Sequence, residues 1–369
     1  MRPQNTFRRL RIALVPPLWA RVAPATQGGV EYIVYLLAEG LVKRGHEVTV
    51  FTSSDSPTIA KVEALCECNM IEAMERNRAW EYAYYETCNI AEALQRSNSF
   101  DIVHFHMGGY AIPLGVLSRA PVLHTLHNPI TPDAIWLLER YANAPVSAVG
   151  RQQIAKIPQK RRSSIRVIYN GCDFEAYEFS SSPGKHLAFL GRMGPEKSPL
   201  DAIRIAKQAG LPIVLAGQPL DEEERAYFVK KVEPLIDGKN VIYVGQVDYR
   251  EKVDLLKHAC ALLFPIQWDE PFGLVMIEAM ACGTPVVALQ RGSVEEVVDF
   301  GKTGFYADSM QALSSLVPRA LSLDRRAVRD GARERFGHER MVDEYLQAYE
   351  EILQASRNGL PVLTPARDS

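Results

Sequence analysis

The chain has 369 residues, of which 47% are hydrophobic and 23% are charged. This length predicts about two domains, and the apolar content suffices for packed cores, which excludes a disordered protein. The 42 Lys and Arg nearly balance the 44 Asp and Glu, so there is no overall basic excess to hold a nucleic-acid backbone.

Neither a disulfide scaffold nor a membrane span is predicted. The 6 cysteines are scattered, and no CxxC pair suggests a zinc knuckle. No apolar run reaches the ~18–20 residues of a membrane span, and the first one, 10–18, contains prolines and does not resemble a signal peptide. We therefore expect a protein of the reducing cytoplasm.

The first half of the chain alternates strand and helix patterns. A buried strand is predicted at 11–16 (RIALVP), followed by helical apolar spacing over 31–44 that ends at Gly45, a common helix stop. A long helical stretch is expected over about 58–97. Further strands are predicted at 47–52, 100–105, 121–125 and 144–149.

The same alternation restarts after a polar break at 180–184 (SSSPG). Ser198 can cap the helix predicted at 199–209, and Pro199 suits its first turn. The last predicted helix, 339–354, precedes a tail at 355–369 that we expect to be flexible. The other predicted elements are strands at 186–190, 212–216, 240–244, 260–265 and 285–288 and helices at 221–235, 250–259 and 273–281.

Strands separated by helices predict an α/β protein with doubly wound parallel sheets. In such sheets ligands bind at the carboxyl ends of the strands, where loops and helix N-termini gather. Two sheets would place these ends around a cleft, so residues with a chemical role are sought directly after strands.

The first such motif is 27–30 (QGGV), between the first strand and the first helix. Gly28 and Gly29 let a ligand approach the backbone, and a helix N-terminus favours an anion. An ordinary turn explains the motif equally well. Because no GxGxxG sequence is present, a nicotinamide site is not expected.

The second motif is 190–198 (LGRMGPEKS), again between a strand and a helix. Glu196 stands where a P-loop requires glycine, which excludes a Walker-type nucleotide site. Arg192 and Lys197 at a helix start nevertheless suit the oxygens of a diphosphate. The alternative is two solvated surface charges.

The third motif, 268–288, contains a helix that is apolar on all sides except at Glu278. A buried carboxylate needs a hydrogen-bond donor, and a pair of ligand hydroxyls is one candidate. A structural ion pair with a distant residue is the other. Phe272 and Gly273 open this helix and can point N–H groups at a phosphate, and Glu270 can face the same ligand.

Four histidines follow strands, and a metal site is one interpretation of them, with Asp101 and Asp133 as further ligands. We favour His104 and His124 as core residues and place His106 at the strand's carboxyl end, facing the cleft. The histidines are His104, His106, His124 and His127.

Two further groups of residues are more ordinary. A run of basic residues without an acid can attract an anionic acceptor or lipid, but a solvated face is the favoured interpretation. An aromatic group can stack on a sugar, but packing is favoured. The basic residues are Arg151, Lys156, Lys160, Arg161, Arg162 and Arg166; the aromatic residues are Trp80, Tyr82, Tyr84 and Tyr85.

The motifs follow one another along nearly the whole chain, and their order is informative. The paired glycines are followed by 101–106 (DIVHFH), 167–171 (VIYNG), 191–197 (GRMGPEK) and the acid-x7-acid segment 270–278. In this combination the sequence resembles the retaining nucleotide-sugar glycosyltransferases of glycosyltransferase family 4.

The resemblance implies a GT-B fold, in which two Rossmann-like domains face a central cleft. The N-terminal domain, 1–175, would lie on the acceptor side, and the C-terminal domain, 176–335, would bind the donor. The helix 336–354 would cross back to the N-terminal domain.

The resemblance also implies a role for each motif. Arg192 and Lys197 would neutralise the leaving diphosphate, Glu270 would contact the donor sugar, and His106 would lie near its reacting side. Glu278 would hold the ribose hydroxyls. The remaining donor-binding residues would be Gly28 and Gly29 against the diphosphate, Gln246 and Val247 near the base, and Phe272, Gly273 and Leu274 as N–H donors.

The implied activity is transfer of a hexosyl group, with retention, from a nucleoside diphosphate sugar to an acceptor hydroxyl. UDP-sugars are favoured, and neither a metal nor another cofactor is expected, in agreement with the absence of a DxD pair at a strand end. The acceptor can be a small metabolite, a saccharide or a lipid carrier; a nucleic acid is not expected, and peripheral membrane contact is not favoured. The alternatives are a non-hydrolysing nucleotide-sugar epimerase, a histidine-based metallohydrolase and a non-enzymatic sugar-nucleotide binding module.

Overall fold

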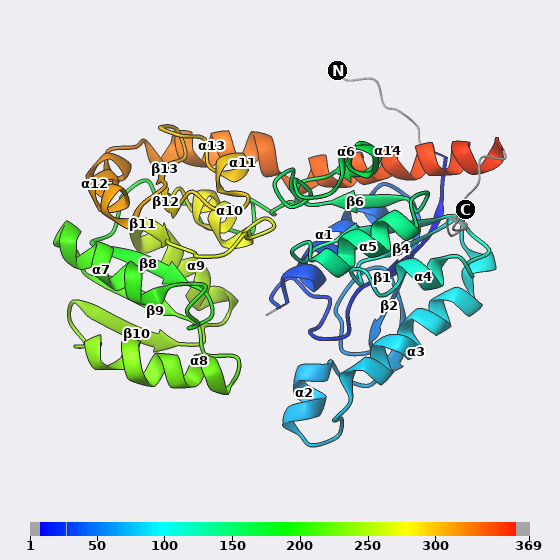
Figure 1. The fold of residues 1–369 in the computed structure, drawn as a ribbon, viewed down its shortest axis with the longest axis horizontal. Coiled ribbons are helices and arrows are strands. Elements are labelled where there is room, and N and C mark those ends of the chain that lie inside the picture. The colour runs from blue at the N-terminus through cyan, green and yellow to red at the C-terminus, as the bar shows by residue number, and fades with distance from the viewer. Residues whose placement is uncertain (1–7, 27, 359–369) are drawn as a thin grey trace. The chain divides into compact units, whose positions relative to one another are not determined.

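The computed structural model describes residues 8–26 and 28–358, which form two compact units (Figure 1). Unit 1 comprises the chain up to Val149, Ile154–Gly171 and the chain from His338 onward. Unit 2 comprises Gly150–Gln153 and Cys172–Gly337. Each unit is built on its own parallel sheet, as the alternation of strands and helices predicted.

The sheet of unit 1 has seven strands in the order β3-β2-β1-β4-β5-β6-β7, all paired in parallel. Its central strands are buried along nearly their whole length, because helices cover both faces of such a sheet. The strands are β1 Arg11–Val15, β2 Glu47–Ser53, β3 Lys61–Cys66, β4 Ile102–Phe105, β5 Val122–Leu126, β6 Val146–Ala148 and β7 Arg166–Val167.

Helices α1 and α14 pack against each other in unit 1, and α14 also contacts β5. Helix α3 packs on β1, β2 and β3. Right-handed connections on the two sides of β1 place α1 and α3 on opposite faces of the sheet. The helices are α1 Gly29–Lys43, α2 Met70–Glu75, α3 Tyr82–Gln95, α4 Ile112–Gly115, α5 Pro132–Arg140, α6 Gln159–Arg162 and α14 His338–Arg357, with a 3-10 turn at Ser97–Ser99.

The long helix expected over 58–97 is wrong. Its first part is the edge strand β3, which pairs with β2, and two helices follow. Asn69 caps α2 by accepting a hydrogen bond from the Glu72 N–H. Asn77, just after the end of α2, adopts the left-handed conformation, which prevents the helix from continuing. At the end of the chain, α14 continues to Arg357, so the start of the expected flexible tail is helical; residues 359–369 lie outside the described residues.

The sheet of unit 2 has six strands in the order β10-β9-β8-β11-β12-β13, again all parallel. Strand β11 is buried at every residue, as expected for the centre of a doubly wound sheet. The strands are β8 His186–Leu190, β9 Ile213–Ala216, β10 Val241–Gly245, β11 Ala259–Phe264, β12 Val286–Leu289 and β13 Gly304–Ala307.

Helices α7 and α12 pack together over this sheet, while α9 and α10 pack on each other and on β11. The predicted helix 221–235 is interrupted: α8 passes into a π turn at Phe228–Val232 and a 3-10 turn at Glu233–Leu235. The α-helices are α7 Pro199–Ala209, α8 Glu222–Tyr227, α9 Tyr249–His258, α10 Leu274–Ala281, α11 Val294–Val297, α12 Met310–Leu321 and α13 Arg325–Phe336.

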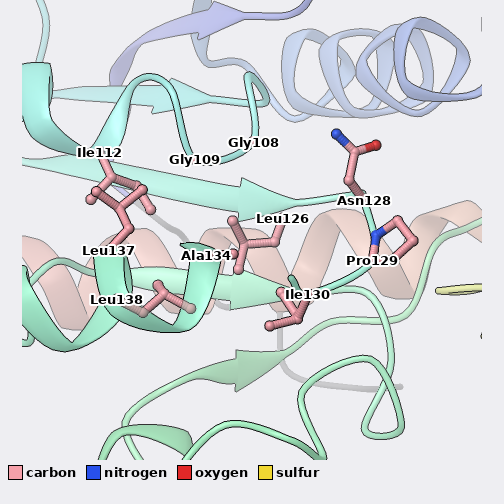
Figure 2. Close-up of a pocket in the computed structure, with 10 residues that line it drawn as sticks. All are labelled: Gly108, Gly109, Ile112, Leu126, Asn128, Pro129, Ile130, Ala134, Leu137 and Leu138. Carbon is pink, nitrogen blue, oxygen red and sulfur yellow. The ribbon is translucent and has the colours of Figure 1, made fainter. Parts of the chain in front are cut away.

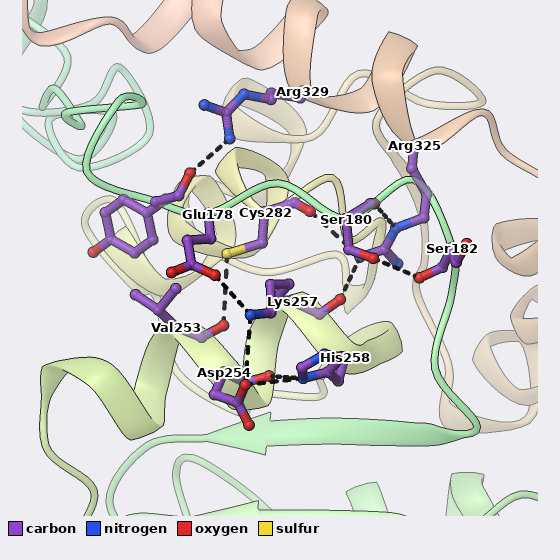
Figure 3. Close-up of polar contacts among 11 residues, drawn as sticks. Glu178, Ser180, Ser182, Val253, Asp254, Lys257, His258, Cys282, Arg325 and Arg329 are labelled. Atoms are coloured by element: carbon purple, nitrogen blue, oxygen red, sulfur yellow. Dashed lines mark hydrogen bonds and ion pairs between the residues drawn. The ribbon is translucent and has the colours of Figure 1, made fainter.

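A buried arginine fastens α13 to the rest of unit 2 (Figure 3). The Arg325 guanidinium donates to the carbonyl oxygens of Ser180, Lys257 and Ala259 at 2.7–2.8 Å. The carbonyls at helix C-termini lack partners within their own helix, and Lys257 lies in the last turn of α9. This arginine therefore satisfies carbonyl groups that burial would otherwise leave without donors.

The predicted capping role of Ser198 is not observed. Ser198 precedes α7 in the left-handed conformation, with a φ of 58°, and its side chain makes no capping hydrogen bond. Its hydroxyl instead donates to Asp201 at 2.6 Å. Pro199 occupies the first position of the helix, as predicted.

No helix in residues 8–26 and 28–358 is both long and apolar enough to cross a membrane.

Candidate functional site

The strand order places the second motif and the acid-x7-acid motif together at one point of unit 2. The sheet reverses its winding between β8 and β11, and this switch point is where ligands bind in open α/β sheets. The loop after β8 carries Arg192 and Lys197, and the loop after β11 carries Glu270. The Gln267 N–H donates to the Glu196 carbonyl at 2.7 Å, which joins the two loops.

Arg192 is held by two carboxylates and is not simply solvated. It forms ion pairs with Glu196, four residues further along the same loop, and with Glu224 on α8. The Glu224 side chain is 4% exposed and also accepts the Leu220 N–H at 2.7 Å. A Cβ on Gly194 would lie 2.5 Å from this carboxylate, so only glycine lets the loop approach it. The guanidinium therefore has a fixed position at the switch point.

Lys197 and Glu270 are in direct contact. The Lys197 Nζ lies 2.5 Å from Glu270 Oε2, and the Trp268 indole N–H donates to the same oxygen at 2.9 Å. The ammonium also lies 4.8 Å from the centroid of the Trp268 ring. The structure thus brings together two of the predicted catalytic residues, and it adds Trp268, the first residue of the third motif, to which no role was assigned.

Glu278 is buried in α10 and has partners from distant parts of the chain. Its Oε1 accepts from the Lys252 ammonium at 2.6 Å and from the Tyr177 hydroxyl at 2.7 Å. Of the two explanations open at the sequence level, the ion pair with a distant residue is therefore observed. A ligand hydroxyl would be a further partner of a carboxylate that is already paired.

Helix α10 begins at Leu274, shortly after Glu270 in the chain. Gly273 has a φ of +78° and precedes the helix, where no side-chain cap is present. Phe272 is buried, and its carbonyl accepts from the Ser293 hydroxyl at 2.7 Å. Leu274 is the first helical residue and is partly buried. This first turn suits an anion because Gly273, the residue before the helix, has no side chain that could cap it.

Gln246 and Val247 follow the edge strand β10 directly, at the same carboxyl end of the sheet. Gln246 is exposed and Val247 is partly buried. The residue before them, Gly245, has a φ of +72°, which allows the chain to turn there before α9 begins.

In unit 1 the paired glycines lie at the start of α1, although Gln27 falls outside the described residues. Gly29 is the first residue of the helix, and Gly28 precedes it. A Cβ on Gly28 would lie 2.0 Å from a carboxylate oxygen of Glu31, so that carboxylate closes over the turn. Glu31 is buried and accepts the Ala20 N–H at 3.0 Å, and burial raises its pKa to about 7.

His106 follows β4 at the switch point of unit 1, between β1 and β4. Its backbone N–H donates to the Val15 carbonyl. Its ring is buried, with Nδ1 2.9 Å from His127 Nε2. Its Nε2 has no hydrogen-bond partner in the part of the chain that the structure describes. Burial holds the pKa of His106 well below the usual range and lowers that of His127 to about 4.

The two strand histidines are core residues, as favoured. His104 bonds the Tyr349 hydroxyl and the Thr125 hydroxyl, both at 2.7 Å. His124 is buried and stacks on Phe105, but both its ring nitrogens lack partners among the described residues, so it is not satisfied. Burial lowers its pKa to about 3.

The structure does not assemble the four histidines as a metal site. Across residues 8–26 and 28–358, no group of three or more His, Cys, Asp or Glu side chains could hold a metal ion. His104 is occupied by hydroxyl groups, and Asp101 is paired with Arg11. Asp133, the other expected ligand, lies in the first turn of α5.

A small hollow opens beside the carboxyl ends of β4 and β5 in unit 1 (Figure 2). Its volume is about 340 Å³ including space open to solvent, and no charged side chain lines it. In Figure 2 the Asn128 amide points away from the apolar side chains. The lining residues are Gly108, Gly109, Ile112, Leu126, Asn128, Pro129, Ile130, Ala134, Leu137 and Leu138.

Several residues of the basic run have structural partners. Arg161 is buried and donates to the carbonyls of Leu138 and Ala144, while Arg162 donates to that of Ala155. Arg166 pairs with Glu351 on α14. These side chains are therefore not all part of one solvated basic face.

The aromatic group divides in two. Tyr82 and Tyr85 pack against a small cluster around Leu18 and Met70, whereas Trp80 and Tyr84 are about 70% exposed. Packing therefore explains only half of the group.

Comparison with known proteins identifies the family. Residues 27–176 match the model of Glycosyltransferase Family 4, and residues 178–338 match that of Glycosyl transferases group 1. The chain belongs to glycosyltransferase family 4. It has the GT-B fold, with one parallel-sheet α/β domain in each unit, and it is a glycosyltransferase.

Similar proteins match nearly the whole length of this glycosyltransferase. It is 26% identical to the D-inositol 3-phosphate glycosyltransferase of Mycolicibacterium smegmatis, covering 96% of this chain and 93% of that protein. It is also 26% identical to the N-acetyl-alpha-D-glucosaminyl L-malate synthase of Bacillus anthracis, with 90% and 96% covered.

Two solved structures share the fold. AviGT4, a glycosyltransferase involved in avilamycin A biosynthesis, is 25% identical, with a TM-score of 0.69 over 94% of this chain and 98% of AviGT4. Anabaena HepE in complex with UDP superposes with a TM-score of 0.71 at 19% identity, over 92% of this chain and all of HepE.

Sequence reasoning missed the partners of the site residues. The partners of Glu278 and Arg192, namely Lys252, Tyr177 and Glu224, come from other elements and belong to no recognisable motif. Trp268, the partner of Glu270, lies in the third motif, but no role was assigned to it. The one available signal was the isolated Glu278 in an apolar helix, which required a buried donor without naming it.

Proposed function

We propose that this glycosyltransferase transfers a hexosyl group from a nucleoside diphosphate sugar, with retention and without a metal ion. One observation carries the proposal: Arg192 and Lys197 lie on the same loop at the switch point of unit 2, and each is held by carboxylates. Two fixed cations at that position match the two phosphates of a nucleoside diphosphate.

The donor would occupy the carboxyl edge of unit 2. The residues proposed to donate N–H groups to a phosphate at the start of α10 are Phe272, Gly273 and Leu274. Glu278 would accept the ribose hydroxyls, and Gln246 with Val247 would lie along the base. UDP-sugars are the first donors to test, since they are the commonest in the family that the motifs resemble.

The cations would act on the departing group. As the bond between the sugar C1 and the phosphate oxygen breaks, negative charge develops on the diphosphate, and a fixed Arg192 and Lys197 stabilise it without reorganisation. Glu270 pairs with Lys197 and would contact the sugar, so the ion pair would fix the position of the carboxylate relative to the ammonium. In unit 1, Gly28, Gly29 and His106 are the residues to which the resemblance assigns further donor contacts.

Retention would follow from attack on the face that the leaving group vacates. The acceptor oxygen forms the new bond to C1, and its proton passes to a phosphate oxygen of the departing diphosphate. No protein nucleophile is required, and the diphosphate itself is the base. A neutral His106, consistent with its lowered pKa, would hydrogen-bond the sugar without adding charge.

The experiment uses donor hydrolysis, because water can replace the unidentified acceptor. The protein is incubated with UDP-glucose, GDP-mannose or ADP-glucose in the presence of EDTA, and NMR follows the first anomer released. We expect release of the α anomer from a donor with an α linkage. Release of the β anomer would exclude retention, and a loss of turnover in EDTA that Mg²⁺ restores would exclude metal independence.

A matched pair of variants tests the site itself. Lys197→Ala should lose hydrolysis, whereas Lys207→Ala, at the opposite end of helix α7, should retain it. Equal rates in the two variants would remove Lys197 from the proposed site. A thermal-shift series with UDP, GDP and ADP would then show whether a nucleotide binds to the protein at all.

A further inference from the structure

Three side chains from separate parts of unit 2 are in contact: those of Glu278, Lys252 and Tyr177. Glu278 lies on α10, Lys252 lies on α9, and Tyr177 belongs to the segment that leads into β8. The Glu278 side chain is 8% exposed and that of Lys252 is 20% exposed, so the ion pair is largely removed from water. A pair in such a place costs desolvation, which good geometry and additional hydrogen bonds must offset.

The two contacts use only one oxygen of the carboxylate. Lys252 Nζ lies 2.6 Å from Glu278 Oε1, and the Tyr177 hydroxyl donates to the same Oε1 at 2.7 Å. Oε2 makes no hydrogen bond within the described residues. Two donors on one oxygen fix the rotation of the carboxylate and leave the second oxygen able to accept from a ligand.

The Lys252 ammonium is itself enclosed. Its Nζ lies 5.7 Å from the ring centroid of Tyr177 and 5.5 Å from that of Tyr249, at distances where a ring face attracts a cation. The Tyr249 hydroxyl donates to the Ala176 carbonyl at 2.8 Å, which ties that ring to the chain beside Tyr177. The ammonium therefore has little freedom to leave Glu278.

Tyr177 is held from the other side. It is 1% exposed, and the Arg329 guanidinium on α13 donates to its carbonyl oxygen at 2.9 Å. Arg329 also donates to the carbonyl of Ala281, the last residue of α10. One arginine thus fixes both the tyrosine and the helix that carries the carboxylate.

Helix α9 also links this cluster to the base side of the proposed site. It begins at Tyr249, two residues after Val247, with a capping box formed by Asp248 and Glu251. The turn proposed to lie along the base therefore leads directly into the helix that carries Lys252.

We infer that Lys252 and Tyr177 are positioning residues for donor recognition, which hold Glu278 so that its second oxygen meets a ribose hydroxyl. This inference rests on the proposed ribose-binding role of Glu278. Neither residue needs to touch the nucleotide, because both act through the carboxylate.

The test compares a nucleotide that has the ribose hydroxyls with one that lacks them. Calorimetry measures binding of UDP and of 2′,3′-dideoxyuridine diphosphate to the full chain and to Lys252→Met. We expect the variant to lose about tenfold in affinity for UDP and less than about twofold for the dideoxy nucleotide. In donor hydrolysis, KM should rise while kcat at saturating donor stays unchanged.

Tyr177→Phe is the second variant, because it keeps the buried ring and removes only the hydroxyl. It should weaken UDP binding by about fivefold, the value of one hydrogen bond, and leave the dideoxy nucleotide unaffected. If Lys252→Met does not fold, as thermal unfolding will show, this variant decides alone. Lys257→Met is the matched control on α9. Lys257 pairs with the exposed Glu178 (Figure 3) and not with Glu278, so binding should not change.

The outcomes distinguish the positioning role of Lys252 and Tyr177 from the ribose contact proposed for Glu278. If the wild-type protein prefers UDP but the variants lose affinity equally for both nucleotides, or lose none, the positioning role is wrong and the proposed function stands. If the wild-type protein binds both nucleotides equally, the ribose role of Glu278 falls, and the inference falls with it.

Discussion

The carboxyl edges of the two sheets have the same topology and opposite chemistry. In unit 2 the switch point is lined by ion pairs, with Arg192 and Lys197 each held by carboxylates. In unit 1 it carries His106 and His127, whose lowered pKa values keep them neutral near pH 7. A common fold therefore carries ion pairs at one edge and neutral imidazoles at the other, and the diphosphate is proposed to bind at the charged edge.

The largest expected effect is on the charged edge. Arg192→Ala and Lys197→Ala should each lower donor hydrolysis by at least about 100-fold, by analogy with the removal of other groups that stabilise developing charge. Arg204→Ala, an exposed arginine on α7 paired with Asp201, is the control and should retain its rate. Near-normal turnover in both site variants would mean that the cations of unit 2 do not serve the leaving group.

The core of unit 1 should make this unit sensitive to acid, because it contains the buried His124. His124 has a pKa of about 3 in the folded protein and the ordinary value of 6.5 when unfolded, so the unfolded chain binds more protons between these values. Its contribution is complete above pH 6.5 and is lost as the pH falls toward 3. From pH 6.5 to 5 the loss is about 2 kcal/mol.

His124→Leu tests this sign. The variant removes a buried ring whose nitrogens lack partners among the described residues, so it should be more stable at pH 5 and depend less on pH. Urea unfolding at pH 5 and pH 7 measures both effects. The pKa assignment is contradicted if wild-type and variant proteins lose stability in parallel between these pH values.

An intermediate effect is expected for the carboxylate of α10. Glu278→Ala should weaken UDP binding by about tenfold, because ribose hydroxyls lose their acceptor, while kcat at saturating donor changes less. Calorimetry and steady-state hydrolysis separate the two quantities. Unchanged affinity for UDP would leave Glu278 with a purely structural role, as the partner of Lys252.

The smallest effect concerns competition for Arg192. Glu196 pairs with this arginine, and its side chain is 32% exposed, so a bound diphosphate would share the cation with it. Glu196→Gln should therefore strengthen UDP binding by about two- to threefold, less at high salt because partly exposed pairs are screened. Weaker binding would show that Glu196 orients the arginine for the ligand.

The sequence could predict the alternation of strands and helices and the position of each motif after a strand. These features are local: the apolar period within a segment, a glycine stop such as Gly45, or Pro199 at a first helical turn depends on residues a few positions apart. The error at 58–97 arose where local pattern was weakest. Strand β3 is an edge strand, only partly buried, that is defined by its pairing with β2.

What only the tertiary structure decided is the partner of each charge. Glu278 required a donor by its sequence context alone, but Lys252 lies 26 residues away and Tyr177 lies 101 away. Arg192 meets Glu224 across 32 residues, and His106 meets His127 across 21. Periodicity fixes which face of an element is buried, whereas packing between distant elements fixes which side chains meet there, because those contacts exist only once the chain has closed on itself.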